Sequence, residues 1–411
     1  MRGRHAINDQ TASPGHARPG PLEGIRVLDL SRFIAGPVCA QLLGDMGAQV
    51  IKVERPGGED AREQGSRYKG ESLYAMAFNR NKFGITLDTR HPAASDILAR
   101  LIRVSDVLVE NYRPGTLESM GLNPKHLRDL NPGLVVTSLS GFGQTGPLSA
   151  RVLFDPIAQA MSGLMALTGD SDGPPVLTGT YIADHLAGLY GAIGTLLALF
   201  ARQRTGQGQA VDVASLDALF SCLGSRPLEV AMLGLIPKRH GSRDAFSSPA
   251  NIFRAADGYL YIHGGTDPLF SKLCAVIGRP DLAADPRFAD VASRMLAPDE
   301  LEAAVSGWVA GRTVSEATQA LAGAGIPFGP VAEIADAVAS AQIAARDMLV
   351  EVEHPTLGPV ILTGVPVKLS ATPGAVRKAP PVVGEDNDRI YGDLLELSSA
   401  EIADLRASGA I

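Results

Sequence analysis

The chain of 411 residues is poor in side chains that hold metals or form disulfides. Its three cysteines, Cys39, Cys222 and Cys274, are scattered and form no C-x-x-C pair. Its eight histidines show no H-E-x-x-H or other ligand spacing. These absences argue against a metal site and against a disulfide framework, and they fit a reducing, cytoplasmic location.

The chain also lacks an excess of positive charge. Lys and Arg number 37 against 44 Asp and Glu, for a formal net charge of −7. This balance argues against nucleic acid as a partner, because no basic block offsets it. Residues 1–20 lack the apolar core of a signal peptide, and we expect a disordered tail there. Hydrophobic residues make up 45% of the chain and charged residues 20%, which predicts a soluble globular protein with a large core. The length of 411 residues is enough for two or three domains.

Long hydrophobic runs are almost absent as well. One run, from His185 to Ala201, falls just short of a membrane span and contains Gly188, Gly191 and Gly194 at helical spacing. It has no proline, which predicts a helix. We interpret it as a buried core helix and expect no membrane partner. Each glycine weakens a helix by roughly 1 kcal/mol relative to alanine, so close packing on a neighbour should compensate.

Apolar strands alternate with helices over residues 21–215. Such alternation predicts an α/β fold with a parallel, doubly wound sheet. The texture then changes to a hairpin around Asp257-Gly258 and two helical stretches, which indicates a smaller α/β domain. A second hairpin follows near the end of the chain. The expected strands are 25–30, 47–54, 106–111, 134–140 and 211–215, the helices 35–46, 93–104, 299–309 and 314–324, and the hairpins 252–263 and 349–362.

Asp184 is the main candidate for a catalytic residue. It directly precedes the apolar run, where a carboxylate feels the positive end of the helix dipole, which should keep it ionised even when partly buried. An ionised carboxylate in an apolar, glycine-lined cleft can be a nucleophile towards an acyl group. The alternative is an N-cap of the helix, a role that is compatible with the first. We interpret the adjoining His185 as structural, because neighbours on a helix diverge.

Two further patterns bear on ligand binding. Residues 141–146 match G-x-G-x-x-G, but Pro147 follows and no helix begins, which argues against NAD or FAD. A glycine loop close to a ligand remains the expectation. Basic side chains at or near strand ends could together hold phosphates, although ordinary surface charge is the alternative for each: Arg55, Arg80, Lys82, Arg90 and Arg113.

A series of segments runs in order along nearly the whole chain from residue 21. They are PLEGIRVLDL (21–30), AGP (35–37), GDMGAQVIKVERPG (44–57), NRNK (79–82), VENYRPG (109–115), SGFGQTGP (140–147), Asp184 with its glycine-rich helix, TGQGQ (205–209) and GIPFGP (325–330). Together they resemble the class III CoA-transferases, the formyl-CoA transferase or carnitine-dehydratase type family.

The resemblance implies an interlocked homodimer. Each chain would have a Rossmann-like, CoA-binding large domain of residues 21–217 and 335–411 and a small domain with linkers, 218–334. Asp184 matches the catalytic aspartate, which attacks an acyl-CoA thioester to form a mixed anhydride and then an enzyme-CoA thioester. An acceptor carboxylic acid takes over the CoA. CoA thioesters are then substrates, and no tightly bound cofactor is implied.

The resemblance also implies a set of CoA-binding positions. They are Ile34, Ala35, Arg55, Leu87, Arg90, Asn111, Tyr112, Arg113 and Asp155. Two departures stand out. Ser119 occupies a position where some relatives carry an arginine that helps to hold CoA. Gly264-Gly265 is a short counterpart of the glycine-rich loop of oxalate-using members, which disfavours formate and oxalate. From the general similarity to the family, we expect succinyl-CoA as the donor and a dicarboxylate as the acceptor.

Two other functions are alternatives to CoA transfer. The family also contains α-methylacyl-CoA racemases, which pair the aspartate with a histidine in a Gly-His-Asp triplet. This chain has Leu153-Phe154-Asp155 there, and phenylalanine cannot exchange a proton, which disfavours racemisation. The other rival is a catalytically silent acyl-CoA-binding protein, against which the retained Asp184 argues.

Overall fold

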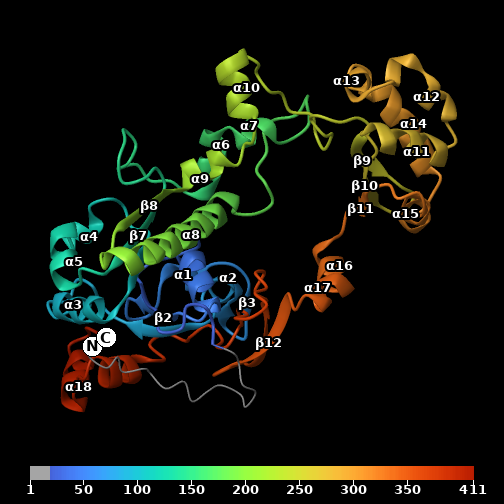
Figure 1. The fold of residues 1–411 in the computed structure, drawn as a ribbon. Coiled ribbons are helices and arrows are strands. Elements are labelled where there is room, and N and C mark those ends of the chain that lie inside the picture. The colour runs from blue at the N-terminus through green and yellow to red at the C-terminus, as the bar shows by residue number, and fades with distance from the viewer. Residues whose placement is uncertain (1–18) are drawn as a thin grey trace. The chain divides into compact units, whose positions relative to one another are not determined.

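The computed structural model describes residues 19–411, so the predicted tail lies almost wholly outside the described residues (Figure 1). The chain forms two compact units. The first unit contains the residues up to Leu164, Thr178–Pro227 and Ala341–Ile411, and the second contains Met165–Leu177 and Leu228–Ser340. After the second unit ends, the C-terminal segment of the chain therefore returns to the first unit.

A six-stranded sheet in which every neighbouring pair is parallel organises the first unit. The predicted α/β fold with a parallel sheet is confirmed. The strand order is β5-β2-β1-β6-β7-β8. From β1 the chain first adds β2 and β5 on one side, and it then crosses to the other side of β1 to add β6, β7 and β8, so the switch point lies between β1 and β6. Ligands of such sheets bind at this switch point, beyond the carboxyl ends of the strands. The strands are β1 (Arg26–Asp29), β2 (Gln49–Glu54), β5 (Lys82–Thr86), β6 (Val107–Glu110), β7 (Val135–Ser140) and β8 (Ala210–Ala214).

The edge strand β5 was not predicted, and side chains of the C-terminal segment complete it. The N–H groups of Gly84 and Thr86 donate to Asp386 and Asn387 at 2.8 and 2.9 Å. These bonds cover an edge that would otherwise be open to pairing with another chain. Tyr391, in the π-helix η3 (Arg389–Leu394), donates its hydroxyl to the carbonyl oxygen of Thr86 at 2.6 Å. The segment ends with α18 (Ser399–Ala407).

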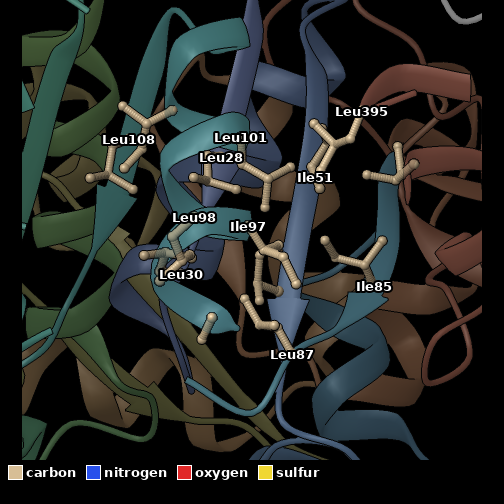
Figure 2. Close-up of a cluster of buried hydrophobic side chains, with 14 of the residues drawn as sticks. Leu28, Leu30, Ile51, Ile85, Leu87, Ile97, Leu98, Leu101, Leu108 and Leu395 are labelled. Atoms are coloured by element: carbon tan, nitrogen blue, oxygen red, sulfur yellow. The ribbon is translucent and has the colours of Figure 1, made fainter. Parts of the chain in front are cut away.

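An apolar core lies against the sheet beside helix α3 (Ala94–Val104) (Figure 2). Leu28 and Ile51 from central strands meet Leu98 and Leu101 of this helix, and Leu395 of the C-terminal segment belongs to the same cluster. Because these side chains come from distant parts of the sequence, the core joins the C-terminal segment to the N-terminal part of the first unit. The smaller elements of that unit are η1 (Asp60–Glu63), β3 (Arg67–Tyr68), β4 (Glu71–Ser72), α2 (Leu73–Ala77), α4 (Thr116–Ser119), α5 (Pro124–Leu130), α6 (Asp155–Ser162), α9 (Ser215–Ser221), α17 (Ala341–Ala345) and the hairpin strands β12 (Leu349–His354) and β13 (Gly358–Thr363).

The glycine-rich run forms α8 (Ile182–Thr205), which packs closely on α1 (Ala35–Asp45) and on the sheet. A Cβ atom added to Gly188 would lie 2.7 Å from Val38 and 2.8 Å from the backbone oxygen of Ala35. A Cβ atom at Gly191 would lie 2.9 Å from Leu139 on β7. The predicted close packing of the glycine face is confirmed.

The opposite face of α8 differs from the prediction of a buried helix. Its side chains Leu189, Ile193, Leu197 and Phe200 are exposed, Leu197 to 64%. Among residues 19–411, α8 is the one helix whose length and composition would also suit a membrane span, a property that core helices of soluble proteins share. The helix thus has one face packed in the core and one apolar face without a covering element in the single chain.

The second unit is built on the antiparallel sheet β11-β10-β9, and the predicted hairpin around Asp257-Gly258 is confirmed. The two predicted helical stretches appear as α14 and α15. The strands are β9 (Ala250–Arg254), β10 (Tyr259–His263) and β11 (Phe328–Pro330); the helices are α11 (Asp267–Val276), α12 (Pro280–Ala284), η2 (Pro286–Phe288), α13 (Val291–Arg294), α14 (Pro298–Ala310), α15 (Val314–Gly323) and α16 (Ile334–Val338). Two helices span the boundaries between the units, α7 (Leu164–Leu167) and α10 (Arg226–Leu233).

Candidate active site

A cavity of about 380 Å³ opens where the loops after β1, β6 and β7 meet. This is the switch point of the sheet, where a ligand is expected. The loops contribute residues 32–35, 111–114 and 140–141, and the segment 149–156 adds a further wall. Asp184, at the start of α8, lies on the same cavity, as does Gly141 of the glycine loop. The predicted glycine loop close to the site is therefore found there.

Asp155, and not Asp184, caps helix α8. Oδ1 of Asp155 accepts from the backbone N–H of Ala183 at 2.6 Å and of Asp184 at 3.3 Å. Gln159 donates to the other carboxylate oxygen at 2.6 Å, and Asp155 is only 2% exposed. The N-cap alternative for Asp184 is thus wrong. Within residues 19–411 the carboxylate of Asp184 makes no hydrogen bond or ion pair, which leaves it free to react.

Burial, with a smaller contribution from the negative charge of Asp155, raises the pKa of Asp184 to about 7. The dipole of α8 acts in the opposite direction, but removal from water has the larger effect. The expectation that the dipole keeps this group ionised is therefore only partly correct, because the protonated and ionised forms coexist near neutral pH. A raised pKa also makes the ionised form a stronger nucleophile than an ordinary aspartate.

This pKa predicts a pH dependence for acylation of Asp184 by a saturating acyl-CoA. The rate should rise with pH and level off above about 7, because only the ionised carboxylate attacks. Asp155→Asn should move the midpoint to lower pH, since it removes a negative charge while its amide oxygen can still cap α8. Rapid quenching followed by intact-protein mass spectrometry measures the rate. A wild-type midpoint near 3.8, the ordinary value for aspartate, would contradict the assignment.

Six of the predicted CoA-binding residues line this cavity with Asp184. They are Ile34, Ala35, Asn111, Tyr112, Arg113 and Asp155. The other three do not line it: Arg55 is bonded to Gly58 and Asp60, Leu87 is buried in the core, and Arg90 is exposed. Ser119 donates its hydroxyl to the carbonyl oxygen of Thr116 and also lies outside the cavity.

The prediction that Lys82 and Arg80 could help to bind phosphates is wrong. Lys82 is fully buried, and its ammonium group is bonded to Asp29, Asn79 and the carbonyl oxygen of Pro37. Arg80 is also buried and forms a bidentate pair with Asp45. Lys82, the first residue of β5, is paired with Asp29 at the end of β1. Arg80, which precedes β5, is paired with Asp45 at the end of α1.

Several residues of the cavity were not predicted from the sequence. They are Arg32, Phe33, Tyr74, Ser140, Arg151 and Tyr181. Tyr74 comes from α2, and its ring packs edge-on against that of Tyr181, with centroids 6.4 Å apart. No local pattern marks these residues, because only the tertiary fold brings them to the site. His185 bonds the carbonyl oxygen of Tyr181 at 2.8 Å and packs on Phe78, so its structural interpretation is confirmed.

The fold and the cavity define the class of protein, an α/β protein that holds its ligand at the switch point of a parallel sheet. Comparison with known families is more specific. Residues 22–387 match the model of CoA-transferase family III. The chain belongs to this family, as the sequence motifs predicted, and it is a CoA-transferase.

Individual relatives agree with this assignment. The chain is 40% identical to a succinyl-CoA–D-citramalate CoA-transferase of Chloroflexus aurantiacus, over 96% of this chain and 98% of that protein. It is 39% identical to an acetyl-CoA:oxalate CoA-transferase of Acetobacter aceti, over 86% and 90%. A crystal structure of a CAIB/BAIF family protein from Brucella suis superposes with a TM-score of 0.83 at 34% identity, covering 92% of this chain and 100% of that one. The predicted reaction, transfer of CoA from an acyl-CoA to a carboxylic acid, is confirmed at the level of the family.

Proposed function

We propose that Asp184 carries the acyl group and the CoA during transfer. The observation that supports this role is its carboxylate, which lies on the cavity without a hydrogen-bond partner among residues 19–411. A carboxylate oxygen attacks the thioester carbonyl, the C–S bond breaks, and a mixed anhydride forms as CoA thiolate leaves. The thiolate then attacks the aspartyl carbonyl, which releases the donor acid and leaves an enzyme-CoA thioester.

The second half of the cycle repeats these steps with the acceptor. The acceptor's carboxylate attacks the enzyme-CoA thioester, and CoA thiolate leaves again as a second anhydride forms. The thiolate attacks the acceptor's carbonyl, and the break of the anhydride restores the carboxylate of Asp184. In each half of the cycle the CoA thiolate that leaves is the nucleophile of the following step, and the acceptor acid replaces the released donor acid between the halves, so no other co-reactant is needed.

For substrates, we propose succinyl-CoA as donor and a dicarboxylic acid as acceptor. The relative from Chloroflexus aurantiacus is named for succinyl-CoA and D-citramalate, and citramalate is a dicarboxylic acid larger than oxalate. Arg113 and Arg151 line the cavity, and neither side chain has an ion pair within residues 19–411, so cationic groups are available for anionic substrates. Because Gly264-Gly265 is short, we keep the preference for acids larger than oxalate. A panel of acyl-CoAs crossed with a panel of acids, read by mass spectrometry, tests this, and preference for oxalate would overturn it.

We place part of the CoA against the predicted residues of the cavity, with Arg113 as its main cation. Arg113→Ala should raise the KM for acyl-CoA about 10-fold or more and leave kcat nearly unchanged, because a hydrogen bond to a charged group contributes about 1.5–3 kcal/mol. Lys125→Ala is the matched control, since Lys125 is exposed on α5, pairs with Asp129 and lies outside the cavity. An unchanged KM in Arg113→Ala would refute this placement. Arg55 and Arg90 lie beyond the cavity, where we propose contacts with more distant parts of CoA.

The second candidate, an α-methylacyl-CoA racemase, needs a group that returns a proton on the opposite face. Phe154 occupies the position of the racemase histidine, lines the cavity and is 60% exposed. Its ring has no exchangeable proton. We therefore expect no enzyme-dependent uptake of deuterium at the α-carbon of 2-methylacyl-CoA in D₂O. Uptake at rates comparable to turnover would favour the racemase.

For assembly, we propose the interlocked, cytoplasmic homodimer of Rossmann-like large domains and small domains implied by the resemblance. The exposed apolar face of α8 supports association, because contiguous apolar patches on soluble proteins mark interaction sites. Linked chains cannot separate while both stay folded, so dissociation and unfolding should coincide. Folded monomer seen on dilution by analytical ultracentrifugation would contradict the interlocked arrangement.

A further inference from the structure

One wall of the cavity is a short loop after β1, residues 31–34, with an unusual backbone. Phe33 has a φ of 62°, in the left-handed region that residues other than glycine rarely adopt. Such a conformation costs about 1 kcal/mol or more and persists only where the surroundings determine it. No side chain caps the start of α1 that follows. The shape of the loop therefore depends on contacts from other elements.

Side chains from neighbouring strands bind the backbone groups of this loop one by one. The amide of Asn111, beyond β6, donates to the carbonyl oxygen of Arg32 at 2.7 Å and accepts from its N–H at 2.8 Å. Asp29, at the end of β1, accepts from the N–H and the hydroxyl of Ser31. Two further groups of the loop, the carbonyl oxygen of Ser31 and the N–H of Phe33, have partners on other segments.

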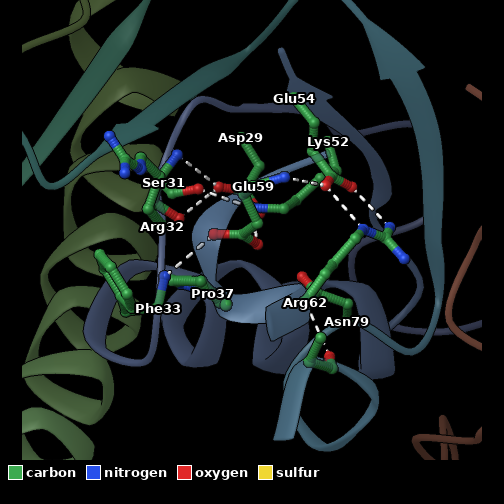
Figure 3. A network of polar contacts seen from close by, with 12 residues as sticks. Asp29, Ser31, Arg32, Phe33, Pro37, Lys52, Glu54, Glu59, Arg62 and Asn79 are labelled. Carbon is green, nitrogen blue, oxygen red and sulfur yellow. Dashed lines mark hydrogen bonds and ion pairs between the residues drawn. The ribbon is translucent and has the colours of Figure 1, made fainter. Parts of the chain in front are cut away.

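A buried ion pair binds these two groups (Figure 3). Nζ of Lys52 on β2 donates to the carbonyl oxygen of Ser31 at 2.6 Å, and Oε2 of Glu59 accepts from the N–H of Phe33 at 3.2 Å. Nζ of Lys52 lies 2.9 Å from the other oxygen of Glu59, and the two residues are 1% and 6% exposed. Burial acts to lower the pKa of Lys52, but the neighbouring carboxylates, Glu59 foremost, raise it, so the Lys52 ammonium group stays charged.

Stability alone gives little reason for charges at this position. Removing two charges from water costs several kcal/mol per ion, and apolar side chains of similar volume often fill such a space equally well. The pair does supply hydrogen bonds of fixed direction to the backbone of the loop. Oε2 of Glu54 accepts from the backbone N–H of Glu59 at 2.9 Å, and Arg62 holds Glu54 through two hydrogen bonds. Glu54 therefore fixes the backbone of Glu59, while the carboxylate of Glu59 holds the loop.

We propose that Glu59 is a positioning residue of the transferase: paired with Lys52, it holds Phe33 in its left-handed conformation and so fixes the wall of the cavity beside Asp184. The role in turnover rests on the proposed function of this cavity. The role in holding the loop rests on the contacts alone. The requirement is for a carboxylate, because one of its oxygens must accept from Phe33 while the other faces Lys52.

Glu59→Gln tests this requirement, since glutamine can accept from Phe33 only by turning its NH₂ group towards Lys52. Amide hydrogen exchange of the peptide that covers residues 31–36 should become about 10-fold faster or more, without any substrate present. With succinyl-CoA, kcat should fall about 10-fold to 100-fold with little change in KM, because a small displacement of a reaction site is costly. The matched control is Asp45→Asn, which breaks the buried pair with Arg80 and touches no residue of the loop. It should lower stability and leave both readouts unchanged.

A second variant separates positioning from folding. Lys52→Met with Glu59→Met removes both charges, so no unpaired charge is left buried, and it also leaves the loop unheld. It should fold and show the same faster exchange and lower kcat. Wild-type exchange at residues 31–36 in both variants would overturn the inference, whatever the enzyme's activity. Failure of Asp184 in the wild type to become acylated would instead overturn the proposed function, while the exchange result would still decide the role of Glu59.

Discussion

Replacement of Asp184 by asparagine is expected to lower the rate of CoA transfer by about 10³-fold or more, with acyl-CoA binding nearly intact. Asparagine keeps the shape of the side chain and removes the nucleophilic oxygen. The carboxylate makes no hydrogen bond within residues 19–411, so its loss should disturb little else. The loss should therefore appear in kcat. Steady-state kinetics and acyl-CoA binding by calorimetry measure the two quantities.

The intermediates on Asp184 give a direct check of this prediction. Wild-type enzyme incubated with acyl-CoA and then with hydroxylamine should carry a hydroxamate at residue 184, and Asp184→Asn should carry none. Asp217→Asn is the matched control, because Asp217 also lies in the first turn of a helix, α9, but outside the cavity. It should keep wild-type activity. Substantial turnover by Asp184→Asn, with deamidation back to aspartate excluded, would refute the assignment.

Gly188→Ala is expected to lower the free energy of unfolding by about 2 kcal/mol. The added Cβ would lie 2.8 Å from the backbone oxygen of Ala35 and 2.7 Å from Val38, so α1 and α8 must move apart. Overpacking of this kind costs about 1–3 kcal/mol, and near its upper end it exceeds the gain of about 1 kcal/mol in helix propensity. Activity should fall too, because the first turn of α1 lines the cavity. Denaturant unfolding followed by circular dichroism measures the change.

Gly307→Ala is the control for that experiment. Gly307 lies inside α14 and is exposed, and a Cβ there would meet no atom within 4 Å. Only the gain in helix propensity from glycine to alanine then remains, and the free energy of unfolding should rise by up to about 1 kcal/mol. Equal effects of the two substitutions would show that the contact between α1 and α8 is looser than the structure indicates.

The features that depend on local pattern could be predicted from the sequence. Alternating strands and helices predicted the parallel sheet, because burial on both faces requires apolar strands. The spacing of Gly188, Gly191 and Gly194 predicted close packing, because residues three or four apart share one face of a helix. The order of the motifs predicted the CoA-transferase family. The strand β5 was missed, since its sequence, KFGIT, is interrupted by a glycine and shows no continuous apolar run.

Which side chains meet depends on the packing of distant segments and could not be predicted from the sequence. Asp155 and Asp184 are 29 residues apart, yet one caps the helix that carries the other and helps to raise its pKa. Lys82 has a sequence context no different from that of a surface lysine, but its strand places it beside Asp29 in the interior. Charges interact through space, and burial depends on every element packed around a group. The chemistry of Asp184 and the holding of the loop by Glu59 therefore follow from contacts between distant segments, which no local pattern records.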